Sequence, residues 1–171
     1  MKVEPFILDA VRNLYLPAFR HIVEAELFSS DSVGRYSASR ENPVCSAEFL
    51  VSPGSYMVRK NEYAGCVDIQ ACIGQIVQVA WGQMLKEGLV KFGSVEDFIS
   101  NGFDMMFSIG SAPDMRHKRQ IPTNQKFPGV IRLDKLKEFE KGIIVETEYD
   151  FNDKSCIGKS KFYLEHVSIA Q

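Results

Sequence analysis

The sequence predicts an α+β domain in which a curved antiparallel sheet wraps around one long central helix. The first observation behind this prediction is the run from Ile69 to Leu85, which contains four glutamines and no charged residue. The second is the segment Gly142–Phe151, which alternates apolar or β-branched residues with mostly acidic ones, as a strand with one wet face does. The third is the order of the segments, with two strands before the long helix and several after it.

The uncharged run is predicted to be a buried helix of a globular protein. It is about as long as the thinnest membrane span, but its glutamines would need polar partners in lipid, so no membrane span is expected. The helix should begin between Ala64 and Asp68 and end near Gly88, because Lys86 suits a last turn and glycine commonly follows one. An unpaired buried amide costs about 1 to 3 kcal/mol. The glutamines must therefore bind backbone groups, water or a ligand, and a ligand beside this helix is the first hypothesis.

The segments before the long helix are predicted to form one short helix and two strands. Apolar residues at helical spacing follow Pro5, which suits a first helical turn. A polar connection around Arg40–Pro43 separates the two strands, and the turn sequence Ser52-Pro53-Gly54 ends the second. The predicted elements are a helix over Pro5–Phe19 and strands over His21–Phe28 and Cys45–Val51.

The segments after the long helix are predicted to be mostly extended, apart from a turn or two of helix at Val95–Ser100. The last two strands form an antiparallel hairpin through Asn152-Asp153-Lys154. We see no internal repeat or linker, so a single domain over residues 1–171 is expected. This order of elements is that of a hot-dog fold. The extended segments are Phe103–Ile109, Arg116–Ile121, Val130–Leu133, Gly142–Phe151 and Ile157–Val167.

The composition narrows the classes of function. The chain contains 20 basic and 22 acidic residues, for a net charge of -2. This balance argues against general nucleic-acid binding. The first residues lack the pattern of a secretory signal, and the four cysteines contain no Cys-x-x-Cys pair, so a cytoplasmic protein with reduced core cysteines is expected. The three histidines lack metal-ligand spacing with one another or with the cysteines, so no metal site is expected.

Two stretches of the chain resemble the FcoT-like family of hot-dog fatty acyl-CoA thioesterases. The resemblance extends over most of the chain from about Phe49 onward. It implies a hot-dog fold with an acyl-thioester pocket, a fatty acyl-CoA or acyl carrier protein as partner, and no cofactor other than coenzyme A as part of the substrate. Because edge strands need pairing and the active site of such folds usually falls between two subunits, a homodimer or higher homo-oligomer is expected. The matching stretches are Ser55-Tyr56-Met57-Val58-Arg59 through Val67-Asp68 to Cys72 and Gln75, and Lys118-Arg119-Gln120-Ile121 followed by Gln125-Lys126-Phe127.

The chain departs from the family at the residues associated with hydrolysis. Where the family has Gly-His-Phe-Asn, this chain has Asn61-Glu62-Tyr63-Ala64-Gly65, and Gly74 stands where the family has an asparagine before the helix glutamine. The family tyrosine aligns with Tyr56, or with Met57 in a gap-free alignment. The first hypothesis is hydrolysis of an acyl-CoA or acyl-carrier thioester. The alternatives are a non-catalytic acyl-CoA-binding or regulatory hot-dog protein, and a dehydratase or enoyl-modifying enzyme acting on acyl carrier protein.

The candidate catalytic residues lie around the start of the long helix. Asp68 and Gln75 are seven residues apart and share a face with Cys72. Asp68 is the candidate base toward water, and Gln75 would orient that water or the carbonyl group. Tyr56 is the candidate donor to the acyl carbonyl, and Glu62 is the second carboxylate candidate. Each also has an ordinary explanation, because Asp68 suits a first helical turn, Glu62 a solvated loop and Tyr56 a core.

Other residues are candidates for substrate binding. The first turn from Gly65 to Asp68 offers backbone N–H groups to the thioester oxygen, and Cys72 lies on the same side of the helix. As nucleophiles, Cys66 and Cys72 lack a histidine nearby in the sequence, so both are expected to be buried and inert.

The densest basic run of the chain is Arg116-His117-Lys118-Arg119, with Lys126 and Arg132 downstream. Coenzyme A presents phosphates, and acyl carrier protein presents an acidic surface. Arg116, Lys118, Arg119 and Lys126 are therefore assigned to binding either partner. The alternative is a solvated strand edge that resists aggregation.

Overall fold

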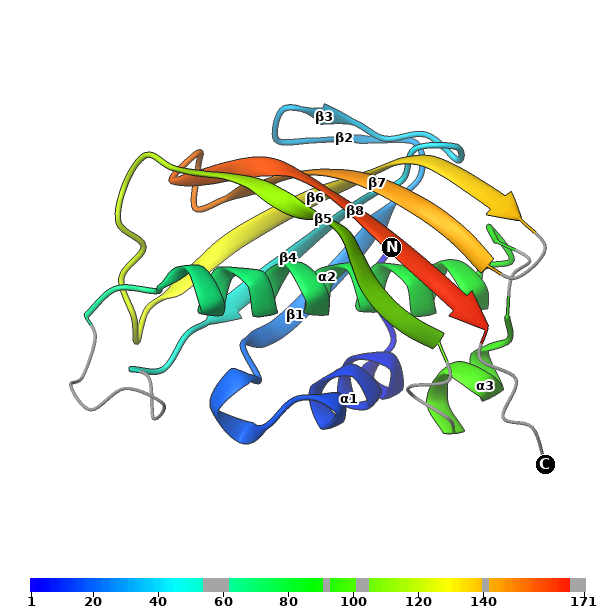
Figure 1. Cartoon of the computed structure of the whole chain (residues 1–171), viewed down its shortest axis with the longest axis horizontal. Coiled ribbons are helices and arrows are strands. Elements are labelled where there is room, and N and C mark those ends of the chain that lie inside the picture. The colour runs from blue at the N-terminus through cyan, green and yellow to red at the C-terminus, as the bar shows by residue number, and fades with distance from the viewer. Residues whose placement is uncertain (54–61, 91–92, 101–104, 140–141, 167–171) are drawn as a thin grey trace.

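The computed structural model describes residues 1–53, 62–90, 93–100, 105–139 and 142–166. A six-stranded antiparallel sheet of order β1-β4-β6-β7-β8-β5 curves over one side of the long helix α2, and helix α1 covers the opposite side (Figure 1). The predicted hot-dog architecture is confirmed. The helices are α1 (Pro5–Leu14), η1 (a 3-10 turn, Pro17–Phe19), α2 (Cys66–Lys86) and α3 (Val95–Ser100). The strands are β1 (Ile22–Phe28), β2 (Ser32–Val33), β3 (Tyr36–Ser37), β4 (Val44–Leu50), β5 (Met105–His117), β6 (Lys126–Phe139), β7 (Gly142–Phe151) and β8 (Cys156–His166).

The predicted limits of several elements need correction. Helix α1 ends at Leu14, because Tyr15 adopts extended backbone angles and Pro17 then opens a separate 3-10 turn. The polar connection between the first two strands contains a short hairpin, β2–β3, that was not predicted. Strand β5 ends at His117, so the predicted extended segment over 116–121 is wrong beyond that residue. The predicted residues Gly54, Phe103 and Val167 lie outside the described parts of the chain.

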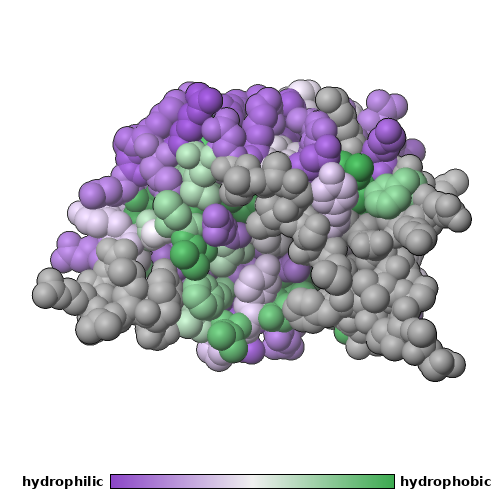
Figure 2. All heavy atoms as spheres, viewed as in Figure 1, coloured by the Kyte–Doolittle hydropathy of each residue, from purple (hydrophilic) through white to green (hydrophobic). Residues whose placement is uncertain are grey.

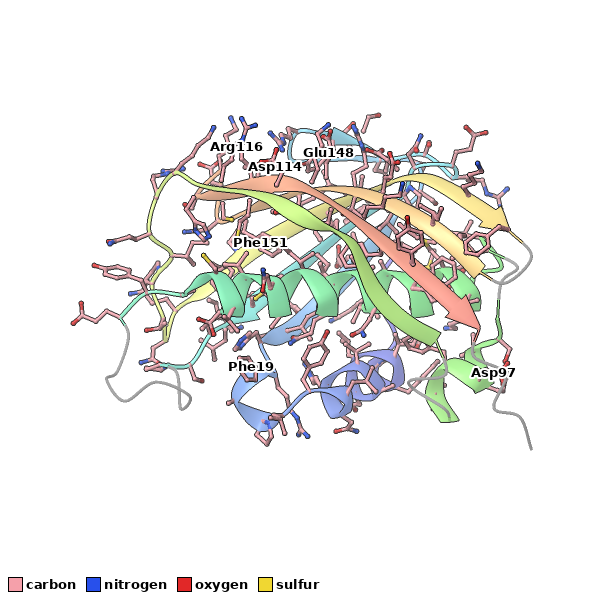
Figure 3. The ribbon with its side chains drawn as sticks, in the orientation of Figure 1. Phe19, Asp97, Asp114, Arg116, Glu148 and Phe151 are labelled. Atoms are coloured by element: carbon pink, nitrogen blue, oxygen red, sulfur yellow. The ribbon has the colours of Figure 1, made fainter. Side chains whose placement is uncertain are left out.

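Strand β7 has the alternation that its sequence predicts. Its buried side chains face α2, and Phe151 lies between the sheet and the helix in Figure 3. Glu148 lies on the outer face, where Lys159 and Arg132 pair with its carboxylate. These contacts lower the pKa of Glu148, first through the bond from Lys159. The sheet thus has one dry face against α2 and one charged face toward solvent.

Two glycines let neighbouring elements approach α2 closely. A Cβ atom on Gly74 would lie 2.6 Å from the hydroxyl oxygen of Tyr15, in the segment after α1. A Cβ atom on Gly82 would lie 2.8 Å from side-chain atoms of both Ile7 in α1 and Phe98 in α3. Because such distances are shorter than packed side chains allow, larger residues at these positions would push α1 away from α2.

The glutamine after each of these glycines forms hydrogen bonds with the backbone of the N-terminal segment. The side chain of Gln83 accepts a hydrogen bond from the backbone N–H of Glu4, the residue before α1, at 3.1 Å. The side chain of Gln75 binds the backbone where η1 runs into β1. We call Gly74-Gln75 and Gly82-Gln83 the Gly-Gln pairs. None of the described helices is long and apolar enough to cross a membrane.

A glycine in the sheet supplies a test of the packing between the sheet and α2. Gly129 on β6 lies beside Ala47 and Phe151, and a Cβ there would come within 2.5 Å of the Phe151 ring and 2.7 Å of Phe49. We therefore expect Gly129→Ala to lower the free energy of unfolding by about 1 to 3 kcal/mol, measured by urea denaturation. Ser46→Ala on the neighbouring strand is the control, and equal stability of the two variants would contradict this packing.

Candidate functional site

The first turn of α2 leaves two of its backbone N–H groups without an acceptor among the described residues. The carboxylate of Asp68 accepts a hydrogen bond from the backbone N–H of Gly65 through Oδ2, at 2.8 Å. Gly65 therefore does not offer its N–H to a ligand, which corrects the role expected of it. The N–H groups of Cys66 and Val67 come next, and they have no acceptor among the described residues. Two backbone donors thus remain available at the positive end of the helix dipole.

Asp68 is buried and lies beside His21, which the sequence did not predict to be part of the site. Its Oδ1 is 3.5 Å from Nε2 of His21, and the two side chains are only 4% and 2% exposed. The side chain of Cys72, one turn along α2, is also fully buried. Burial, followed by the charge of Asp68, raises the pKa of the Cys72 thiol well above its usual value. Neither Asp68 nor Cys72 presents a side chain to solvent, so Cys72 is an uncharged core thiol.

Gln75 has backbone partners on both ends of its amide. Its carbonyl oxygen accepts hydrogen bonds from the backbone N–H groups of His21 and Ile22, at 3.1 and 2.8 Å. Its NH₂ group donates to the backbone carbonyl of Phe19. The predicted shared face of Asp68 and Gln75 exists, because both contact His21. The amide of Gln75 therefore binds the backbone between η1 and β1, whereas the sequence predicted that it would bind water or the carbonyl group of a substrate.

The two remaining catalytic candidates lie on the segment before α2. Tyr56 lies outside the described residues. Glu62 is exposed, and its backbone carbonyl accepts a hydrogen bond from Thr123 at 2.9 Å. The structure thus places the Glu62 side chain on a loop surface at the amino end of α2.

Cys66 is exposed, which corrects the expectation that it is buried, and a histidine lies beside it. Its Sγ is 3.7 Å from Nε2 of His117, which is also exposed. His117 is the last residue of β5 and pairs in register with Cys156 on β8. The sequence showed His117 only as part of a basic run, because nothing local reveals that β5 ends over the first turn of α2.

The basic residues around His117 are exposed, and two have acidic neighbours. Arg116 lies 3.3 Å from the carboxylate of Asp114, and both point away from the sheet in Figure 3. Arg119 lies 3.8 Å from the carboxylate of Asp153. Lys118 is exposed, and its backbone N–H binds the carbonyl of Ser155. Exposed ion pairs of this kind contribute about 0 to 1 kcal/mol, so a phosphate could replace the carboxylates at little cost.

Lys126 does not join this basic group. Its ammonium lies 2.6 Å from the carboxylate of Glu48, and that contact raises its pKa. Both residues line a groove of about 250 Å³ over β1, β4 and β6. A second groove, of about 390 Å³, lies beneath the β2–β3 hairpin and includes Arg35 and Asp150. No residue of α2 lines either groove, so both are separate from the amino end of the helix.

Apolar surface adjoins the amino end of α2. The side chain of Val67 is 52% exposed, and Tyr63 just before the helix is 39% exposed. Figure 2 shows hydrophobic residues gathered over the first half of α2, with polar surface above them. An alkyl chain could lie against such a surface.

The described residues contain no group of histidine, cysteine and carboxylate side chains that could hold a metal ion. Two buried polar atoms on α2, the carbonyl oxygen of Gln78 and the indole nitrogen of Trp81, have no hydrogen-bond partner among the described residues. The four glutamines of α2 therefore differ: the carbonyl oxygen of Gln78 has no such partner, Gln75 and Gln83 bind backbone groups, and Gln70 is exposed.

Comparison with known proteins gives structural neighbours only. No protein-family model and no curated protein matches the chain. The crystal structure of a hypothetical thioesterase from Streptococcus pneumoniae TIGR4 with coenzyme A is similar over 94% of this chain and 99% of its own, with a TM-score of 0.43 and 6% identity. A thioesterase superfamily protein from Shewanella loihica PV-4 is similar over 88% of this chain and 95% of its own, with a TM-score of 0.37 and 12% identity.

The bonds of Gln75 predict a structural role that a pair of variants can test. Replacing Gln75 by leucine leaves two buried backbone N–H groups without an acceptor. We expect Gln75→Leu to lower the free energy of unfolding by about 2 to 6 kcal/mol in urea denaturation, from about 1 to 3 kcal/mol for each of the two unpaired groups. Gln70→Leu, at an exposed position of the same helix, is the control and should change stability by less than about 0.5 kcal/mol. Unchanged stability of Gln75→Leu would contradict this role.

Proposed function

We propose that this protein binds an acyl thioester at the amino end of α2 and hydrolyses it. The observation that carries the proposal is the pair of N–H groups of Cys66 and Val67, which have no acceptor among the described residues and belong to the turn whose Cys66 Sγ lies 3.7 Å from the exposed imidazole of His117. The thioester oxygen gains negative charge when its carbonyl carbon is attacked. Fixed backbone donors at a helix end stabilise that charge.

His117 supplies the base that the reaction needs. A ring nitrogen of its imidazole can take a proton from the attacking group and return it to the leaving thiolate. The buried Asp68 acts indirectly in this proposal, because its bond to the N–H of Gly65 fixes the turn that presents the next two donors.

Two features of the surrounding surface support an acyl-CoA or an acyl carrier protein as the partner. Arg116, Lys118 and Arg119 provide positive charge next to His117 for phosphates or for an acidic protein surface. Val67 and Tyr63 provide exposed apolar surface for the acyl chain. The proposed substrate is therefore a fatty acyl thioester. A homodimer and a cytoplasmic location stay predictions.

A protein that binds the thioester without cleaving it is the second candidate. It is favoured by the partners of Asp68 and Gln75, because both candidate catalytic side chains contact other parts of the fold. Thiol release from acyl-CoAs of several chain lengths separates the candidates. Turnover supports hydrolysis, whereas tight retention of acyl-CoA without turnover supports the binder and contradicts the enzyme.

Charge removal next to His117 tests where the coenzyme binds. We expect the triple variant Arg116→Ala, Lys118→Ala and Arg119→Ala to raise the KM for acyl-CoA by ~10-fold with little change in kcat, since each exposed charge pair contributes about 0.2 to 1 kcal/mol. Lys137→Ala is the control, because Lys137 is exposed near the opposite end of the sheet. Equal KM values for the triple variant and the wild type would place the coenzyme elsewhere.

A further inference from the structure

Three sulfur atoms surround one nitrogen of His117 at the end of β5. Nε2 lies 3.0 Å from Sδ of Met115, 3.7 Å from Sγ of Cys66 and 3.9 Å from Sγ of Cys156. These contacts come from three elements, because Met115 and His117 belong to β5, Cys66 to α2 and Cys156 to β8. We call this group the sulfur cluster.

The contact with Met115 favours a proton on Nε2. A thioether sulfur only accepts hydrogen bonds, so a sulfur 3.0 Å from Nε2 is stabilised when that nitrogen carries a hydrogen. The one hydrogen of a protonated Nε2 can donate to a cysteine sulfur in place of Met115, and that bond is strongest when the sulfur is a thiolate. A proton that Nε2 accepts during a reaction is therefore stabilised by the sulfur atoms around it.

The two cysteines of the cluster differ in their surroundings. Cys156 is fully buried, and burial raises the pKa of its thiol to about 12, so it keeps its proton. Cys66 is exposed at the first position of α2, where the helix dipole stabilises an anion. A helix N-terminus and an adjacent imidazole are two of the surroundings that commonly activate a cysteine. Of these two thiols, only Cys66 can reach a substrate from solvent.

We propose that Cys66 is the nucleophile that accepts the acyl group from the thioester. Its thiol proton passes to Nε2 of His117, and Sγ attacks the carbonyl carbon of the thioester. The carbon–sulfur bond to coenzyme A then breaks, the imidazolium of His117 returns the proton to the leaving thiolate, and an S-acyl Cys66 remains. This inference rests on the proposed function, since it names the group that attacks in that site.

The acyl group then leaves in a second step of the same kind. Water attacks the carbonyl carbon of S-acyl Cys66 while His117 takes a proton from it, and the products are a fatty acid and the restored thiol of Cys66. The backbone N–H groups of Cys66 and Val67 face the charged oxygen in both steps. One nucleophile, one base and one pair of donors thus account for the whole reaction.

Rapid mixing with acyl-CoA, acid quenching and intact-protein mass spectrometry test the inference. We expect one acyl group per chain, located on Cys66 by peptide mapping and absent in Cys66→Ala. In steady state, Cys66→Ala should release thiol at least ~10²-fold more slowly, because a covalent intermediate replaces one difficult step by two easier ones. Gln70→Ala, one turn along α2 and also exposed, is the matched control for folding and for substrate binding.

His117 is tested in the same experiment. We expect His117→Asn to slow formation of the adduct by ~10²-fold or more, the usual contribution of a general base, while acyl-CoA binding is kept. Wild-type thiol release by Cys66→Ala without an adduct would overturn the role of Cys66 and leave hydrolysis in place. An adduct spread over several cysteines would also overturn it. Retention of acyl-CoA with neither thiol release nor adduct would overturn both proposals.

Discussion

The attachment of α1 to α2 through the two Gly-Gln pairs is the constraint on which the rest of the structure depends. An uncharged helix with amides must be buried and must also satisfy those amides. In each pair the glycine removes the side chain that would hold the N-terminal segment away, and the glutamine binds backbone of that segment. The face of α2 opposite the sheet is therefore filled by this chain's own residues, and Tyr15 occupies the space beside Gly74.

This attachment restricts where a ligand can reach α2. Along the helix only Cys66, Val67 and Gln70 near its start and Lys86 at its end are exposed. The first turn also contains the two backbone donors and Cys66, whose Sγ contacts the imidazole of His117 at the end of β5. Asp68 connects the first turn of α2 with the segment before β1. One of its oxygens caps that turn, and the other lies beside His21, in the segment that Gln75 binds. The same bonds thus stabilise the fold and shape the candidate site.

The sequence predicted what depends on local pattern. The absence of charge between Ile69 and Leu85 located α2, and the alternation in Gly142–Phe151 located β7. The hairpin β2–β3 was missed because each of its strands has two residues, which is too short for any period to appear. The division of β5 into two segments was also wrong, since β5 pairs with β8 as one strand up to His117, with register shifts on both sides of Ser111.

The site was predicted less well because its contacts join distant parts of the chain. The shared face of Asp68 and Gln75 follows from helical geometry, but their partners lie about fifty residues away, near His21, where no periodic pattern places them. The pairing of Cys66 with His117 depends on where β5 ends relative to α2. Such a contact is fixed by the register of β5 and β8, and neither residue signals it alone.

The most direct test of the account is a crystal structure with an acyl-CoA analogue in which a methylene group replaces the thioester sulfur. We expect the ketone oxygen to lie within hydrogen-bond distance of the backbone N–H groups of Cys66 and Val67, with its carbonyl carbon facing Sγ of Cys66. An analogue bound in either groove of the outer sheet face, with the first turn of α2 unoccupied, would contradict it.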